Sequence, residues 1–92
     1  MRLDLFLKFS RLVPRRSLAQ EFIKAGRVIV NGTQGKAGRE VGEGDEIEIR
    51  KHSGTTIVRV NAIPDKKQIS KNEATELYEV ISEARQDLDL DF

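Results

Sequence analysis

Pro14 and Gly26 are the residues that most constrain how this chain can fold, because each of them limits a helix. Pro14 disfavours helical geometry in the residue before it, so a helix that begins near the amino terminus must end there. Gly26 tolerates the left-handed conformation that closes many helices. Ser17, with Gln20 three residues later, fits a capping box. The sequence therefore predicts two short helices joined by a basic corner at residues 15–17.

The two predicted helices are amphipathic, since their apolar side chains recur at helical spacing. In the first helix the buried stripe is expected to consist of Leu3, Phe6, Leu7 and Ser10. Asp4 and Lys8 lie on another side, four residues apart, where they can form an ion pair. Leu5 and Phe9 lie on a third side, and we expect them to pack against a later part of the chain or against a hydrophobic partner. The apolar arc of the second helix consists of Leu18, Ala19, Phe22, Ile23 and Ala25.

The middle of the chain has the pattern of short antiparallel strands. Residues 27–30 are rich in β-branched side chains, and Asn31-Gly32 tolerates the positive φ angles of a tight turn, so a strand is expected to turn back there. Residues 46–50 alternate between charged and apolar side chains, which is typical of a strand with one face in water. Residues 51–54 fit a hairpin loop, and residues 55–63 alternate again. A β-hairpin is therefore predicted.

The carboxyl-terminal third combines a polar connector, a predicted helix and an acidic tail. Ser70 and Glu73 form a second capping box, and the apolar residues after it predict a helix that ends near Arg85. Those apolar residues are Ala74, Leu77, Tyr78, Ile81 and Ala84. Residues 87–92 alternate acidic and apolar side chains, and we expect them to be mobile or bound to a partner.

Together these elements predict an α+β fold. Two short helices pack on a small, mostly antiparallel sheet, and a hairpin and a helix follow at the carboxyl end. We expect residues 1–64 to contain the helices, the sheet and the hairpin, residues 65–86 to form the connector and the last helix, and residues 87–92 to be the tail. Ninety-two residues suffice for one small domain but not for a second, catalytic one.

The charged side chains are distributed unevenly, although the net charge is only +1. Residues 1–36 hold eight basic side chains against two acidic ones, a balance of +6. Residues 65–92 hold four basic side chains against eight acidic ones, a balance of −4. The basic residues come from two short helices and the turns that follow, so many of them must share one side of a small domain. This asymmetry favours a polyanionic partner for the amino-terminal part.

Several other kinds of site are disfavoured by the residue inventory. The chain has no cysteine, which excludes disulfides and thiol catalysis, and His52 is its only histidine. Gly32 to Gly35 fits a bare GxxG pattern, but the pattern begins in a strand turn and not between two helices as in KH domains. Ala37 replaces the Ser or Thr of a phosphate loop after Lys36. We expect no enzyme activity, no metal and no cofactor, and the lack of a long apolar run predicts a cytoplasmic protein without a membrane segment.

A series of spaced residues between Arg2 and Ile47 matches a known family pattern. The matching residues are Arg2-Leu3-Asp4, Phe6-Leu7, Arg11, Arg15-Arg16-Ser17, Ala19, Ile23, Gly26-Arg27-Val28, Val30-Asn31-Gly32, Lys36-Ala37, Val41 and Gly44-Asp45-Glu46-Ile47. With these residues the chain resembles the S4-type RNA-binding domain, which is named after a small-subunit ribosomal protein. Its length, hairpin and last helix make it similar to stand-alone bacterial proteins of the heat-shock-fifteen type, and most of all to the RqcP type of ribosome-associated quality control.

The resemblance implies an RNA-binding protein that acts on a large ribosomal subunit carrying peptidyl-tRNA. There it would contact ribosomal RNA and tRNA and support tail elongation on stalled nascent chains, alongside an RqcH-type factor. We expect a monomer. Two alternatives stay open: a heat-shock-type factor that recycles ribosomal subunits, and a small adaptor that binds a protein through Leu5, Phe9 and the acidic tail.

The RNA contacts are expected on the predicted helices and the turns that follow them. The resemblance implies Arg2 and Arg16 as the principal contacts. The full expected set consists of Arg2, Lys8, Arg11, Arg15, Arg16, Gln20, Lys24, Arg27, Asn31 and Lys36. Leu5 departs from the family pattern, which commonly has a lysine directly after Asp4. This departure weakens the basic face or replaces an RNA contact with an apolar one.

Overall fold

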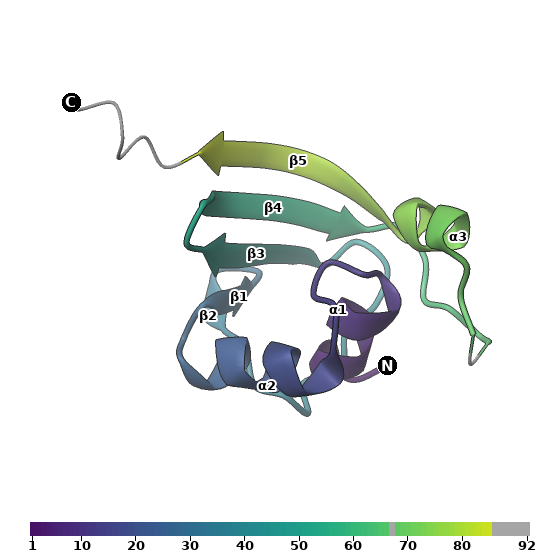
Figure 1. The fold of residues 1–92 in the computed structure, drawn as a ribbon, viewed down its shortest axis with the longest axis horizontal. Helices are drawn as coiled ribbons and strands as arrows, with labels where there is room; N and C mark the ends of the chain where they lie inside the picture. The colour runs from purple at the N-terminus through teal and green to yellow at the C-terminus, as the bar shows by residue number, and fades with distance from the viewer. Residues whose placement is uncertain (67, 86–92) are drawn as a thin grey trace.

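A layer of two short helices packs against part of one face of a five-stranded antiparallel sheet (Figure 1). The structure is a computed structural model that describes residues 1–66 and 68–85. The elements in chain order are α1 (Leu3–Phe9), α2 (Arg16–Lys24), β1 (Val28–Val30), β2 (Thr33–Gln34), β3 (Glu46–Lys51), β4 (Gly54–Val60), α3 (Lys71–Glu76) and β5 (Tyr78–Arg85). The strand order is β2-β1-β3-β4-β5. The predicted α+β fold is confirmed, and the expected acidic tail lies outside the described residues.

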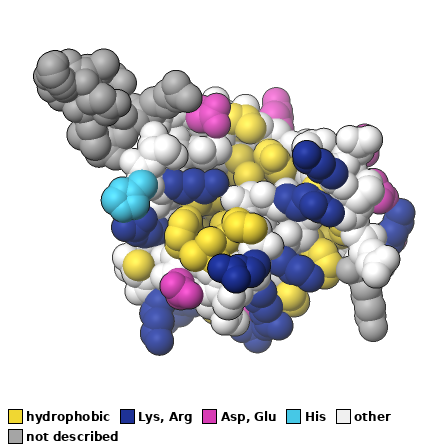
Figure 2. All heavy atoms as spheres, in the orientation of Figure 1, with side chains coloured by type: hydrophobic (Ala, Val, Ile, Leu, Met, Phe, Trp, Pro, Cys, Tyr) yellow, Lys and Arg dark blue, Asp and Glu magenta, His cyan; other side chains and the backbone are white. Residues whose placement is uncertain are grey.

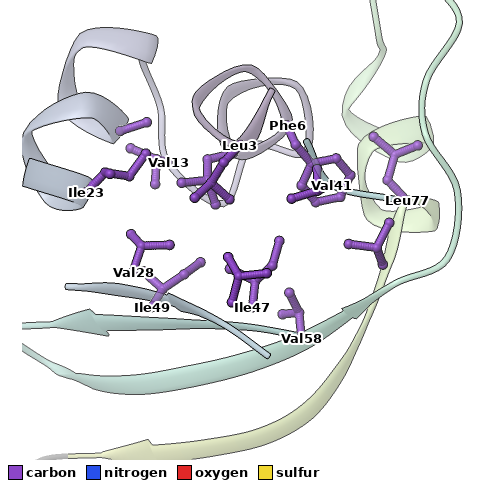
Figure 3. Close-up of a cluster of buried hydrophobic side chains, with 14 residues drawn as sticks. Leu3, Phe6, Val13, Ile23, Val28, Val41, Ile47, Ile49, Val58 and Leu77 are labelled. Atoms are coloured by element: carbon purple, nitrogen blue, oxygen red, sulfur yellow. The ribbon is translucent and has the colours of Figure 1, made fainter. Parts of the chain in front are cut away.

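The hydrophobic core lies between the helices and the sheet. The apolar stripe of α1 is fully buried, as its spacing predicts. Figure 3 shows Leu3 and Phe6 of this stripe pointing towards the strands. Strand residues such as Val28, Ile47 and Ile49 point back at them (Figure 3). Each buried side chain of this size contributes about 1.5–3 kcal/mol. Since strand side chains alternate between faces, Glu46, Glu48 and Arg59 lie on the opposite face of the sheet.

The predicted turns are confirmed. Gly26 has a φ of 76°, and it follows the last turn of α2. Asn31 and Gly32 have φ angles of 50° and 82°, so both occupy the left-handed region that a two-residue hairpin turn between β1 and β2 requires. The hairpin of β3 and β4 is also confirmed, with Lys51 opposite Gly54 at its tip.

The prediction that Ser17 caps the second helix is wrong. The helix begins at Arg16, and Arg15 occupies the N-cap position without a side-chain hydrogen bond to the helix. Gln20, the other member of the expected capping box, donates its side-chain amide to the Asp4 carboxylate at 2.9 Å. The ionised carboxylate makes this hydrogen bond charge-assisted, so Gln20 joins the two helices and is not the partner of a cap at Ser17.

The prediction of a helix up to Arg85 is also wrong. The capping box at its start is confirmed, because the Ser70 hydroxyl accepts from the Glu73 N–H and the Glu73 carboxylate accepts from the Ser70 N–H, both at 3.1 Å. However, α3 ends at Glu76, and Tyr78–Arg85 pairs with the whole of β4. Pairing with β4 satisfies the backbone of this segment, and its β-branched residues fit a strand.

Candidate nucleic-acid interface

A fully buried carboxylate, Asp4, joins the two helices of the basic half. It accepts hydrogen bonds from Arg2 Nε at 3.2 Å and Arg2 Nη2 at 3.3 Å, from Arg16 Nε at 3.2 Å and from Gln20 Nε2 at 2.9 Å. The expected ion pair of Asp4 with Lys8 is therefore wrong. Asp4 points towards α2, where two guanidinium groups and an amide replace the water that its charge has lost.

The Asp4 contacts fix two arginines that are only partly covered. The side chains of Arg2 and Arg16 remain 45% and 44% exposed. Burial raises the pKa of Asp4, but the hydrogen bonds from Gln20, Arg16 and Arg2 outweigh this and hold its pKa below the ordinary value. Asp4 is therefore ionised at neutral pH. The two arginines together carry one more positive charge than Asp4 neutralises, and the terminal nitrogens of Arg16 are left for another acceptor.

A shallow groove between α2 and the loop after β2 brings three further candidates together. Gln20, Lys24 and Lys36 line this groove, whose volume is about 460 Å³. The loop reaches the helices because Gly35 lacks a side chain: a Cβ atom there would lie 2.7 Å from Leu3 Cδ2 and 3.2 Å from the Val28 carbonyl oxygen. Gly35 thus allows the close approach that places Lys36 beside α2.

Lys8 and Arg11 lie at the other end of α1. Arg11 Nη2 donates to the Ile69 carbonyl oxygen at 3.2 Å, and Lys8 Nζ lies 4.5 Å from the centroid of the Phe9 ring. Lys8, Phe9 and Arg11 form one wall of a second groove of about 610 Å³, which we call the Phe9 groove. Its other wall includes Ile69, Ser70 and Glu73. Phe9 and Leu5 are both outside the hydrophobic core cluster.

Arg15 is exposed at the corner that leads into α2. The side chains of Arg27 and Asn31, in contrast, contact other residues of the protein. Arg27 is half-buried, with its guanidinium 5.8 Å from the centroid of the Phe22 ring. Asn31 donates to the Asp45 carboxylate at 3.0 Å and accepts from the Glu46 N–H at 2.9 Å. Its polar atoms therefore hold the β1–β2 turn against β3, beside acidic groups that repel a phosphate.

Sequence reasoning missed the role of Asp4 and the presence of Arg39. An acidic residue within a strongly basic segment is a signal that could have indicated Asp4. Arg39 lies beyond the basic segment that we counted, and it lines a groove with Lys36. Its Nε atom is buried without a hydrogen-bond partner among the described residues, and its carbonyl oxygen accepts from the Leu3 N–H at 2.8 Å.

Figure 2 shows how these charges are distributed on one face of the molecule. Dark-blue Lys and Arg side chains surround apolar ones over the half that contains α1 and α2, and most magenta Asp and Glu side chains lie towards β5 and α3. Across residues 1–66 and 68–85, no group of three His, Cys, Asp or Glu side chains has the arrangement of a metal site. None of the helices in this part of the chain has the length and apolar content needed to cross a membrane.

Comparison with known proteins gives matches over most of the chain. The S4 domain matches residues 1–47. A protein of Halalkalibacterium halodurans named RQC P-site tRNA stabilizing factor is 51% identical over 83 residues, which cover 90% of this chain and 92% of the relative. The protein of the same name from Bacillus subtilis is 42% identical, and the match covers 92% of this chain and 96% of the relative.

Two solved structures share the fold. Heat shock protein 15 of Vibrio cholerae, described as a trimeric structure, superposes with a TM-score of 0.79 at 30% identity and covers 87% of this chain and 80% of its own. The solution structure of the protein HP1423 superposes with a TM-score of 0.76 at 32% identity and covers 89% of this chain and 98% of its own.

Proposed function

Because this chain belongs to the S4-domain family, and because its full-length relatives are named RQC P-site tRNA stabilizing factors, we propose that it binds the large ribosomal subunit and holds the P-site tRNA there. It acts in ribosome-associated quality control by contacting ribosomal RNA and tRNA together, and so supports tail elongation on stalled chains. The protein acts without catalysis, in the bacterial cytoplasm, and an RqcH-type factor works beside it.

The observation that carries this proposal is the arrangement of Arg2 and Arg16 around Asp4. A buried carboxylate holds both guanidinium groups at the junction of the two helices, while nearly half of each arginine side chain stays accessible. Arg side chains bind phosphate through several N–H donors, and a side chain held in place loses less conformational entropy when it binds. Such a pair suits RNA that is recognised by the positions of its phosphates.

Around this pair, Arg15, Lys24 and Lys36 extend the proposed interface along α2 and the adjoining loop. Together with Arg2 and Arg16 they supply about five phosphate contacts, so the logarithm of the binding constant should fall with the logarithm of salt concentration at a slope of roughly −3.5 to −4.5. We leave Asn31 out of the proposed interface because its side chain holds the turn.

The test is co-sedimentation of the protein with large subunits that carry peptidyl-tRNA. Arg16→Gln should weaken binding about tenfold or more, because it removes a charge-assisted contact. Arg59→Gln is the matched control, since Arg59 is equally exposed at 44% and also pairs with a carboxylate, but lies on the opposite face of the sheet. Equal losses for the two variants would contradict the proposed interface.

Subunit recycling without tail elongation is the second candidate, and the similarity to heat shock protein 15 favours keeping it. Both functions need the same RNA-binding face, so binding data do not separate them. Deleting the gene and measuring alanine tails on stalled nascent chains does. Shorter or absent tails support the proposed function, and normal tails with accumulated stalled subunits support recycling.

A further inference from the structure

The Phe9 groove combines an aromatic ring, two cations and an opening to solvent at the edge of the basic face. Its volume of about 610 Å³ is enough for a nucleotide. One wall is the end of α1, and the other is the connector before α3, which passes beside α1 in Figure 1. The hydrophobic core does not need Phe9, because this side chain lies outside the core cluster.

Arg11 has an unusual backbone conformation at this groove. Its φ is 60°, and it follows the C-cap of α1, at a position that helices usually give to glycine. Glycine adopts this conformation without strain, whereas arginine is strained in it, and such strain is often retained at binding sites. The conformation sends the Arg11 side chain across to the connector, where its guanidinium reaches the Ile69 carbonyl oxygen.

Phe9 and Lys8 complete the set of groups. The Phe9 ring is half-buried, and the Lys8 ammonium covers one of its faces at 4.5 Å from the centroid. Lysine is flexible, so its ammonium can move from the ring to a phosphate and leave the ring to a base. Glu73 is the acidic group of the groove, and its carboxylate is already paired with Lys66 at 2.6 Å. The positive charge of Lys8 and Arg11 therefore predominates.

We propose that the Phe9 groove binds one unpaired nucleotide of RNA, with the base stacked on the Phe9 ring and the adjoining phosphate between Lys8 and Arg11. This site rests on the proposed RNA-binding function and adds to it. Arg2 and Arg16, held in place by Asp4, bind phosphates of folded RNA, whereas the groove selects RNA that presents an extruded base. A base and an aromatic ring stack with little sequence preference, so the groove recognises an unpaired base in general.

The test uses single-stranded hexaadenylate RNA and an abasic RNA of the same length, each titrated into the full-length protein. The wild-type protein should bind hexaadenylate about five- to tenfold more tightly than the abasic strand, since both carry the same phosphates and only one can stack. Phe9→Leu should remove this difference. Phe22→Leu is the matched control and should keep it, because Phe22 is also half-buried but packs against the core and Arg27.

A second variant keeps the test independent of folding. Arg11→Gly removes the strain of the left-handed conformation, so the melting temperature of this variant should not fall. Both RNAs should nevertheless bind this variant more weakly, because a phosphate contact is lost. Equal binding of the two RNAs by wild-type protein, or an unchanged preference in Phe9→Leu, would overturn the proposal for the groove. Either result can occur while Arg16→Gln still weakens subunit binding, so the failure of this site and the failure of the proposed function are distinguishable.

Discussion

Replacing Asp4 with asparagine removes the negative charge that holds Arg2 and Arg16, and it keeps the size of the side chain. The carboxylate is fully buried and accepts four hydrogen bonds from three side chains. An amide oxygen can still accept one or two of them. The amide nitrogen, however, then faces the donors of Arg2, Arg16 and Gln20, and the two guanidinium groups repel each other without an intervening charge.

The expected loss of stability follows from these contacts. A hydrogen bond to a charged acceptor contributes about 1.5–3 kcal/mol, and one between neutral groups about 0.5–1.5 kcal/mol. Water screens the two arginines because each is nearly half exposed, and the variant no longer has to bury a charge. The net loss should therefore be about 1–2 kcal/mol, which lowers the melting temperature of a domain of this size by roughly 5–15 °C.

Thermal unfolding followed by circular dichroism at several pH values measures this loss. The pKa of Asp4 is lowered in the folded protein, so its contribution is fully present above the unfolded pKa of about 3.9 and disappears as the pH falls through the folded value. Wild type and Asp4→Asn should differ most at pH 6–7, and the difference should shrink progressively as the pH falls below about 4. A difference that is the same at pH 7 and pH 3, or a variant that melts higher at pH 7, would refute this explanation.

Three further substitutions test the parts of the fold that support the interface. Gly35→Ala should destabilise the protein by about 1–3 kcal/mol, since the new methyl group would overlap with Leu3 and press on the Val28 carbonyl. Urea unfolding measures this loss, and an unchanged midpoint would contradict the close approach of Gly35 to Leu3 and Val28. Ser70→Ala should cost about 1 kcal/mol through the lost N-cap of α3, whereas Glu73→Gln should cost less because glutamine can still complete a capping box. The reverse order of these two losses in melting temperature would contradict the capping geometry.

Local signals in the sequence were enough to predict the turns and the buried stripe of α1. Gly26 and Asn31-Gly32 adopt the left-handed conformations expected of them, because few other residues tolerate those φ angles. The spacing of apolar residues in α1 predicted which side chains are buried. In both cases the decisive interactions involve neighbours within one or two helical turns, which a sequence pattern reports directly.

The strand β5 could not be predicted in this way. Its apolar residues fit a helical spacing, and the capping box at Ser70 starts a real helix. What decides the structure of Tyr78–Arg85 is the free edge of β4, which pairs with the whole segment. The paired residues lie 18 to 31 positions apart in the chain, from Val60 with Tyr78 to Gly54 with Arg85. Single-sequence periodicity does not include such long-range pairing.

The candidate site was predicted in its charge but not in its organisation. The count of basic residues indicated a positively charged region on α1, α2 and the segments that adjoin them. It did not show that Asp4 faces α2, because its partners Arg16 and Gln20 lie 12 and 16 residues away and meet it only when the helices pack. The sequence also did not show the pairing of Asn31 with Asp45 and Glu46, because this pairing depends on β1 lying beside β3.

We propose that RNA binds the face formed by α1 and α2 and not the opposite face of the sheet. A cryo-EM map of the protein on large subunits with peptidyl-tRNA tests it most directly. We predict phosphates within hydrogen-bond distance of Arg2 and Arg16, and the opposite face of the sheet, with Glu48 and Arg59, directed away from RNA. RNA seated on that opposite face, with Arg2 and Arg16 in solvent, would contradict the account.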